Sequence, residues 1–134
     1  MVENDLPTAA EIVTMHEEIE KEYDLKYKGV RIAAPKLTLR EKVVEPASEY
    51  DDPWHCGAVL LFRIPSTHVF EDANKRTAWA VTMEYLNDQG LEVEFPQDDE
   101  TIERIVRRAG LFDIEELAEW LKTGEIDESK LPER

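Results

Sequence analysis

Apolar positions near the amino terminus recur at the spacing of an α-helix. Residues 8–11 (TAAE) form a capping box, in which a threonine and a glutamate satisfy each other's backbone amides. Ile12, Met15, Ile19 and Tyr23 then follow on one face. This pattern predicts a first helix that runs to about residue 23.

Two more helices are expected before the middle of the chain. A second capping box, residues 38–41 (TLRE), predicts a short helix that ends near Pro46. Asp52 precedes Pro53, which is the order of an N-cap and a first helical residue. The sequence after it is apolar on most sides, so we expect a central buried helix that stops at Pro65.

The second half of the chain predicts three further helices around a short strand. The expected elements are a helix with Trp79 on its apolar face that ends at Gly90, a strand at 91–95, a helix at 97–110 and a helix from Asp113 to Leu121.

Residues 27–35 (YKGVRIAAP) do not fit a helix, because they contain a glycine, two β-branched residues and a closing proline. They are typical of a short extended hairpin, a flap that covers a site. The predicted fold is therefore all-α, a compact bundle of about six helices with a small β-hairpin flap. We expect residues 1–134 to form a single domain.

Composition narrows the setting of the protein. No apolar run reaches the ~20 residues of a membrane span, and the amino terminus is acidic where a signal peptide is basic. Both features predict a soluble, unprocessed protein of the cytoplasm. The single cysteine, Cys56, has no partner for an internal disulfide and lies in an apolar run, so we expect it in the core.

The net charge of −15 arises from 31 acidic residues spread along the chain. Such a surface repels nucleic acid and argues against DNA or RNA as a partner. It also favours a halophilic host that keeps a high salt concentration in its cytosol. The cluster Arg104, Arg107 and Arg108, with glutamates nearby, is typical of a solvated helix face.

Residues 68–77 (HVFEDANKRT) concentrate the candidate chemistry. Asp72 is expected as the N-cap of the next helix, which leaves the amides of Ala73, Asn74 and Lys75 free to bind an anion. Lys75 and the neighbouring Arg76 add positive charge, and the Asp72 carboxylate suits a Mg²⁺ ion that bridges phosphates. The combination favours a nucleotide polyphosphate, although an exposed N-cap with unrelated charges explains the residues equally well.

The three histidines of the chain are expected to differ in role. His68 lies one turn before the expected helix and is the candidate general base, with Phe70 as the apolar anchor of the loop. His16 borders an apolar stripe and His55 lies in the buried helix. We interpret both as structural.

Residues 68–77 resemble the signature loop of the Fic/Doc family in its Doc (death-on-curing toxin) form. The order of the other elements is similar too: Met-His-Glu at 15–17, a flap, an apolar helix, the NDQG turn at 87–90 and a final helix. The resemblance covers about residues 7–124.

This resemblance implies the helical Fic/Doc fold and an ATP-dependent transfer onto a serine or threonine hydroxyl of a protein. The roles it implies are His68 as the base, Phe70 as the core anchor, Asp72 as the Mg²⁺ ligand, Asn74 and the helix amides from Ala73 onward as the anion hole, and Lys75 and Arg76 as phosphate contacts.

Departures from the family pattern indicate which group is transferred. AMP-transferring Fic enzymes have glycines in place of Ala73 and Lys75 and a second arginine in place of Trp79. Glycine lets the backbone approach the phosphates closely, whereas a lysine fills that space. In Doc-type toxins this difference goes with a reversed ATP orientation and kinase activity toward elongation factor Tu, a translation factor. The resemblance therefore favours a Doc-type kinase.

Two other functions are the alternatives to this kinase. They are a Fic-type AMP transferase and a non-catalytic module that binds a nucleotide or an antitoxin.

The resemblance also implies a partner. Self-inhibited Fic proteins carry serine or threonine, a glutamate four residues later, and then glycine or asparagine. Here Thr14 and Glu18 are followed by Ile19, which breaks the pattern. We therefore expect inhibition by a separate antitoxin and a monomer when the protein is free.

Overall fold

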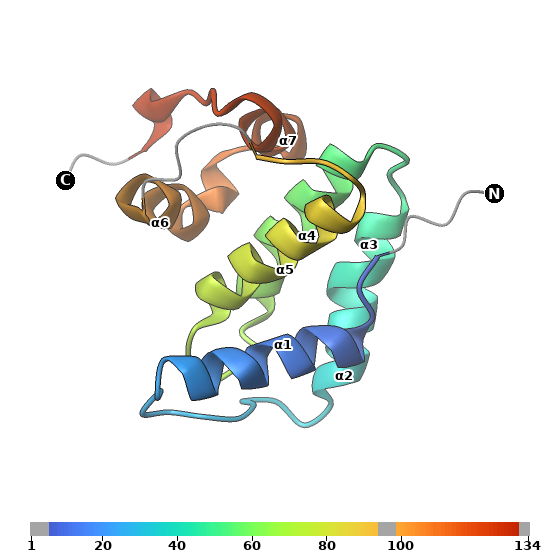
Figure 1. Cartoon of the computed structure of the whole chain (residues 1–134), viewed down its shortest axis with the longest axis vertical. Helices are drawn as coiled ribbons and strands as arrows, with labels where there is room; N and C mark the ends of the chain where they lie inside the picture. Colours follow the sequence, from blue (N-terminus) through green and yellow to red (C-terminus); the bar gives the residue numbers. More distant parts are fainter. Residues whose placement is uncertain (1–5, 94–98, 132–134) are drawn as a thin grey trace.

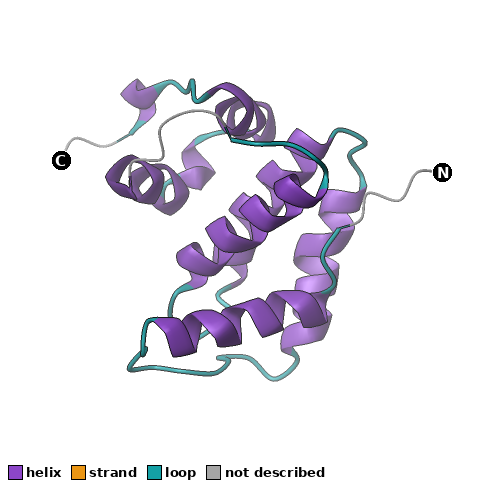
Figure 2. Cartoon of the chain, viewed as in Figure 1, coloured by secondary structure: helices purple, strands orange, loops and turns teal. Residues whose placement is uncertain are grey.

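The computed structural model describes residues 6–93 and 99–131, and in this part of the chain every regular element is helical (Figures 1 and 2). The α-helices are α1 (Ala9–Glu22), α2 (Pro35–Leu39), α3 (Glu45–Ser48), α4 (Pro53–Thr67), α5 (Asn74–Asp88), α6 (Asp99–Arg107) and α7 (Ile114–Thr123). A π-helical turn, Arg40–Val44, joins α2 to α3, and single 3-10 turns lie at Ala109–Leu111 and Glu128–Lys130. Because α2, the π-turn and α3 are continuous, the described chain has six helical units, which confirms the all-α prediction.

Helix α4 is the centre of the bundle. It packs most extensively against α5 and α7, and it also contacts the π-turn and α3. In Figure 1, α1 and the α2–α3 unit lie on one side of the α4–α5 pair, and α6 and α7 lie on the other. Gly57 lies where α4 meets α5 and α7: a Cβ atom there would be in ordinary van der Waals contact with Leu86 of α5 (3.4 Å) and Leu121 of α7 (3.5 Å).

The capping signals predicted most helix boundaries correctly. Both polar pairs of the Thr8–Glu11 capping box form at α1, and Asp52 accepts a hydrogen bond from the Trp54 amide at α4. Asp113 and Glu116 form a second capping box at α7, which ends at Thr123 instead of Leu121. Gly90, with φ of 76°, follows the end of α5 as expected.

Two helix predictions based on proline and capping were wrong. The helix expected to open at residues 38–41 begins earlier, at Pro35, and continues past Pro46 to Ser48. Pro46 stands in the first turn of α3, where a missing amide hydrogen costs little. Helix α4 likewise runs two residues past Pro65, because a proline so close to the helix end removes little of its hydrogen bonding.

The predicted β-hairpin flap is also wrong. Val30 forms an isolated antiparallel bridge with Phe70, a residue of the loop between α4 and α5, and not with a neighbouring strand. The Arg31 amide donates to the Val69 carbonyl (2.7 Å), and the Glu71 amide donates to the Gly29 carbonyl (3.1 Å). The segment thus forms a single bridge to a residue forty positions away, and no hairpin. Of the strand expected at 91–95, residues 91–93 form no regular structure and the rest lie outside the described residues.

Two of the structural assignments made from the sequence are confirmed. Cys56 is fully buried, its thiol contacts the Ala47 carbonyl at 3.3 Å, and burial raises the pKa of that thiol. His55 joins the start of α4 to the start of α7: Nδ1 lies 2.6 Å from Asp52 Oδ2, and Nε2 lies 2.8 Å from Glu115 Oε1. None of the described helices is long and apolar enough to cross a membrane.

The link through His55 depends on protonation. Partial burial lowers the pKa of His55, but the hydrogen bonds to Asp52 and Glu115 outweigh this effect, and the net pKa is raised. Both carboxylates accept hydrogen bonds, so both ring nitrogens donate and the imidazolium is the stabilised form.

We expect the contribution of His55 to stability to decrease as the pH rises. A folded-state pKa above the unfolded value of ~6.5 means that the stabilisation is complete below pH ~6.5 and is lost as the pH passes through the folded pKa. His55→Ala should therefore cost about 1 kcal/mol at pH 6 and less at pH 9. Urea unfolding at both values measures this, with Glu115→Ala as the matched partner variant. An equal loss at both pH values would contradict the link.

Candidate active site

The loop between α4 and α5 begins and ends in left-handed backbone. His68 is the C-cap of α4 with φ of 50°, and Ala73 is the N-cap of α5 with φ of 60°. Neither residue is a glycine, so each conformation costs roughly 1–2 kcal/mol. Such strain persists only where the surrounding structure enforces it, and it is common at functional sites.

Ala73, and not Asp72 as expected, is the N-cap of α5. The Asp72 carboxylate instead accepts a hydrogen bond from the Ala73 amide (2.7 Å). The first amide bonded within the helix is that of Thr77, which donates to the Ala73 carbonyl. No described residue accepts a hydrogen bond from the amides of residues 74–76, so the free amides at the start of α5 lie one residue later than predicted.

The loop presents His68 to solvent and Phe70 to the core. The His68 side chain is exposed and forms no hydrogen bond with any described residue. Phe70 is fully buried, as predicted, and its ring stacks on that of His16 with a centroid distance of 3.7 Å and an interplanar angle of 9°. The loop therefore exposes the side chain of His68 and buries that of Phe70 two residues later.

The side chain of Asn74 holds the loop closed. Its Oδ1 accepts a hydrogen bond from the Phe70 amide (3.1 Å), and its Nδ2 donates one to the Phe70 carbonyl (2.9 Å). The sequence had placed Asn74 among the phosphate contacts. In the structure its side-chain amide is engaged inside the loop, and only its backbone N–H has no acceptor among the described residues.

A buried network connects α1 to the loop and to α5. His16 is 2% exposed, and its Nδ1 lies 2.8 Å from the Thr77 hydroxyl. Its Nε2 lies 3.2 Å from Glu20 Oε2, a close contact whose angle is poor for a hydrogen bond. Burial lowers the pKa of His16, and Glu20 opposes this only in part. A neutral ring with its hydrogen on Nε2 suits this arrangement, because Nδ1 then accepts from the Thr77 hydroxyl and the Nε2 hydrogen lies near the Glu20 carboxylate.

Glu20 extends this network to the segment that follows α1. Its Oε2 also accepts a hydrogen bond from the Gly29 amide at 2.6 Å. Gly29 in turn pairs with Glu71 of the loop. This role of Glu20 was not predicted from the sequence. The signal was present, because Glu20 lies four residues after His16 and both side chains therefore lie on one face of α1.

A cleft of about 500 Å³ adjoins the start of α5. It is lined by Tyr23, Asp72, Ala73, Lys75, Arg76, Trp79, Ile102, Glu103 and Val106. The cleft thus gathers all the predicted phosphate-site residues except Asn74, while His68 and Phe70 lie outside its lining. Its size is within the range of small-molecule sites.

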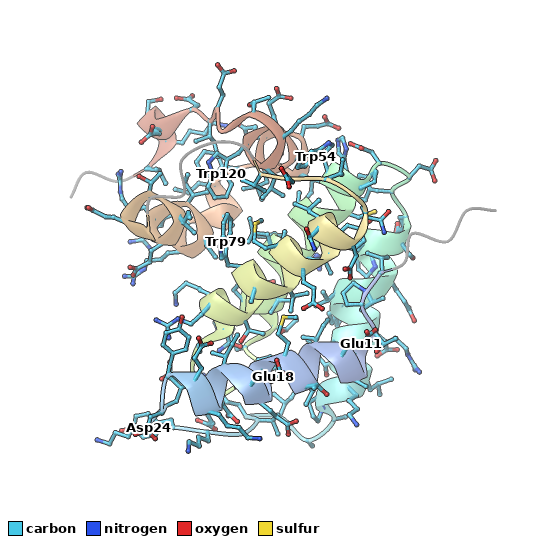
Figure 3. All side chains as sticks on the ribbon, viewed as in Figure 1. Glu11, Glu18, Asp24, Trp54, Trp79 and Trp120 are labelled. Carbon is cyan, nitrogen blue, oxygen red and sulfur yellow. The ribbon has the colours of Figure 1, made fainter. Side chains whose placement is uncertain are left out.

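Aromatic rings define two parts of this cleft. The guanidinium of Arg76 lies 4.0 Å from the centroid of the Tyr23 ring, a cation–π contact. Trp79 packs on the buried Trp120 with centroids 5.7 Å apart, and Figure 3 shows these two side chains between α5 and the α6–α7 end of the bundle. Cationic and aromatic surfaces are therefore both present in the cleft.

A second hollow, of about 320 Å³, lies between α1 and α5. Its lining includes Glu11, Glu18, Glu84 and Asp88, the first two of which are labelled on α1 in Figure 3. Burial raises the pKa of Glu84, and its acidic neighbours raise it further. A phosphate is repelled by these carboxylates, so the cleft at α5 is the better site for a nucleotide.

Comparison with known proteins agrees with this geometry. A model of the Fic/DOC family matches residues 5–86, which include the loop and α1 to most of α5. The chain therefore belongs to the Fic/Doc family, whose members are typically transferases that act on proteins. No curated protein is significantly similar to the chain in sequence.

We expect Glu20 to hold the segment around Gly29 in place. Glu20→Ala removes the acceptor for the Gly29 amide, and trypsin should cleave after Lys28 and Arg31 roughly tenfold faster. Glu20→Gln retains a carbonyl oxygen and should stay close to the parent rate, as should the exposed control Glu17→Ala. Limited proteolysis followed by mass spectrometry gives the rates, and unchanged cleavage of Glu20→Ala would contradict this role.

Ala73→Gly should stabilise the protein by about 0.5–1 kcal/mol. Glycine adopts φ of 60° without strain, and this gain exceeds the entropy that glycine adds to the unfolded chain. The control is Ala80→Gly inside the same helix, which should destabilise by about 0.5–1 kcal/mol. Urea unfolding of both variants measures the difference, and a loss of stability for Ala73→Gly would argue against the left-handed cap.

Proposed function

We propose that this protein is a Doc-type toxin that transfers the γ-phosphate of ATP to a serine or threonine hydroxyl of a translation factor such as elongation factor Tu. The observation that carries the proposal is the lining of the cleft at α5, where Lys75 and Trp79 occupy the positions of a glycine and an arginine in AMP-transferring relatives. Family membership supports a transfer reaction on a protein, and these two residues favour phosphate over AMP.

In this proposal His68 acts as the general base. Its exposed imidazole accepts the proton of the target hydroxyl, whose oxygen then forms a bond to the γ-phosphorus as the bond between that phosphorus and the leaving ADP oxygen breaks. The left-handed backbone at His68 turns the side chain out of α4, where a regular helical residue would follow the helix surface. Phe70 and the clamp by Asn74 fix this orientation.

The start of α5 stabilises the negative charge that develops on the phosphates. The amides of residues 74–76 point out of the helix end, and Lys75 and Arg76 supply two positive charges beside them. Such fixed donors need no rearrangement during the reaction. Trp79, with Ile102 and Val106 of α6, offers an apolar surface that suits the adenine ring better than a third phosphate.

The residues present fit a Mg²⁺ ion bound together with ATP. Asp72 lines the cleft, and one of its carboxylate oxygens binds the Ala73 amide while the other forms no hydrogen bond with the described chain. Mg²⁺ commonly takes one or two protein carboxylates and completes its shell with phosphate and water, and it neutralises phosphate charge when bound. The described residues contain no cluster of three acidic, histidine or cysteine ligands.

Two alternatives remain for the same site. A Fic-type AMP transferase would need the α-phosphate to face His68, but Lys75 lines the space that this orientation uses and Trp79 offers no charge to the distal phosphates. A non-catalytic nucleotide- or antitoxin-binding module would not need an exposed base beside an anion site.

We also propose that a separate antitoxin inhibits this protein. Residues 14–19 do not match the self-inhibitory pattern of Fic proteins, because Ile19 follows Glu18 where that pattern has glycine or asparagine.

The orientation of ATP can be tested with one double variant. The parent should transfer label from γ-labelled ATP, and none from α-labelled ATP, to purified elongation factor Tu. Lys75→Gly with Trp79→Arg should lose at least tenfold of the γ-transfer and gain transfer of labelled AMP. His68→Ala, which changes no residue of the cleft, should abolish both transfers while the protein still binds ATP.

Parent-rate γ-transfer by the double variant would show that Lys75 and Trp79 do not set the orientation of the nucleotide. Transfer by purified His68→Ala protein would remove His68 from the mechanism. Circular dichroism of each variant checks that the fold is retained.

A further inference from the structure

One buried side chain of α1 contacts both halves of the candidate site. The His16 ring stacks on the ring of Phe70, which lies two residues after the candidate base His68. Its Nδ1 lies 2.8 Å from the hydroxyl of Thr77, the residue that directly follows the free amides of residues 74–76. The base and the amide-bearing end of α5 are therefore connected through a single imidazole.

His16 does not bind the nucleotide itself. Its side chain is almost fully buried and does not line the cleft at α5. Thr77 is fully buried as well and is also outside the lining of this cleft. Any effect of these two residues on the reaction must therefore pass through the groups that they hold in place.

The contacts of His16 and the clamp by Asn74 restrain the loop in different ways. Asn74 bonds to both backbone groups of Phe70 and so closes the loop onto the first residue of α5. His16 fixes the closed loop against α1, because it holds the Phe70 ring from a different helix. The side chain of His68 is exposed, so its position follows that of the backbone that carries it.

The arrangement requires a neutral His16. Burial lowers the pKa of this ring. The carboxylates of Glu20 and Glu17 in α1 and of Asp72 in the loop oppose this effect only in part. With its hydrogen on Nε2, the ring accepts from the Thr77 hydroxyl through Nδ1. A hydrogen on Nδ1 would leave this buried hydroxyl without its acceptor, which costs free energy.

We propose that His16 is a positioning residue of the transfer reaction. Through Phe70 and Thr77 it sets the distance between the base and the phosphates at the start of α5. This inference rests on the proposed function, because it assigns residues that orient that same site. Transfer needs the base, the target hydroxyl and the phosphorus in one geometry, and a displacement of about 1 Å can lower the rate roughly 100-fold.

The hydrogen bond between His16 and Thr77 can be removed from either side. Thr77→Val replaces the hydroxyl with a methyl group of similar size, and His16→Phe keeps a ring for the stack but has no nitrogen. Each change should lower kcat for label transfer about tenfold, while the Kd for a non-hydrolysable ATP analogue stays within about twofold of the parent. Thr77→Ser retains the hydroxyl and should keep most of the parent rate.

Thr82→Val is the matched control. Thr82 is also a fully buried threonine of α5, but its hydroxyl has no hydrogen-bond partner among the described residues. We therefore expect kcat of this variant to stay within about twofold of the parent. Circular dichroism and thermal unfolding of each variant check that the fold is retained.

Two measurements without turnover test the link itself. Proton–nitrogen correlation NMR of the histidine rings shows which nitrogen carries the hydrogen, and we expect Nε2 for His16 at neutral pH. The Phe70 amide, which donates to Asn74, should exchange its hydrogen roughly fivefold faster in Thr77→Val than in Thr82→Val, because the loop is held less firmly.

Three results would overturn the proposal. They are equal kcat for Thr77→Val and Thr82→Val, a loss that is confined to binding of the ATP analogue, and a neutral His16 with its hydrogen on Nδ1. If the parent transfers neither phosphate nor AMP, the proposed function fails. The ring spectrum and the exchange of the Phe70 amide then decide whether His16 holds the loop, and equal exchange in the two variants would show that it does not.

Discussion

The candidate site depends on the stack of Phe70 against His16 in the core. This contact joins the loop to α1, and the hydrogen bond between His16 and Thr77 joins α1 to α5. A neutral imidazole is well suited to this position, because one flat side offers a ring surface to Phe70 while its two nitrogens reach Thr77 and Glu20. The loop therefore keeps its shape because both the loop and α5 contact one buried ring from α1, a helix distant from them in sequence.

The strained backbone of the loop follows from this anchoring. With Phe70 fixed in the core, the chain passes from α4 to α5 within a few residues, and left-handed conformations at His68 and Ala73 lie at the two ends of this connection. The same geometry exposes the base and leaves the first amides of α5 open to an anion. The free energy of the strain is offset by the Asn74 clamp and by burial of Phe70.

Acidic and basic side chains are distributed unevenly over the molecule. Carboxylates cover most of the chain and crowd the hollow between α1 and α5, where they raise the pKa of Glu84. Residues 21–36, by contrast, carry five cations and two carboxylates. Arg76 adds a cation close to Tyr23 at the end of α1. An anion is therefore repelled by most of the surface and less so near these cations.

The sequence by itself determined the features that depend on neighbouring residues: the helical spacing, the capping boxes at α1 and α7, the burial of Phe70 and the loop motif of the family. Local signals sufficed because a cap or a helix face involves residues at most a few positions apart. Tertiary structure decided the partner of residues 29–31, the role of Glu20 and the true N-cap at Ala73. These features depend on contacts between segments remote in sequence, and no periodic pattern specifies which segments will meet.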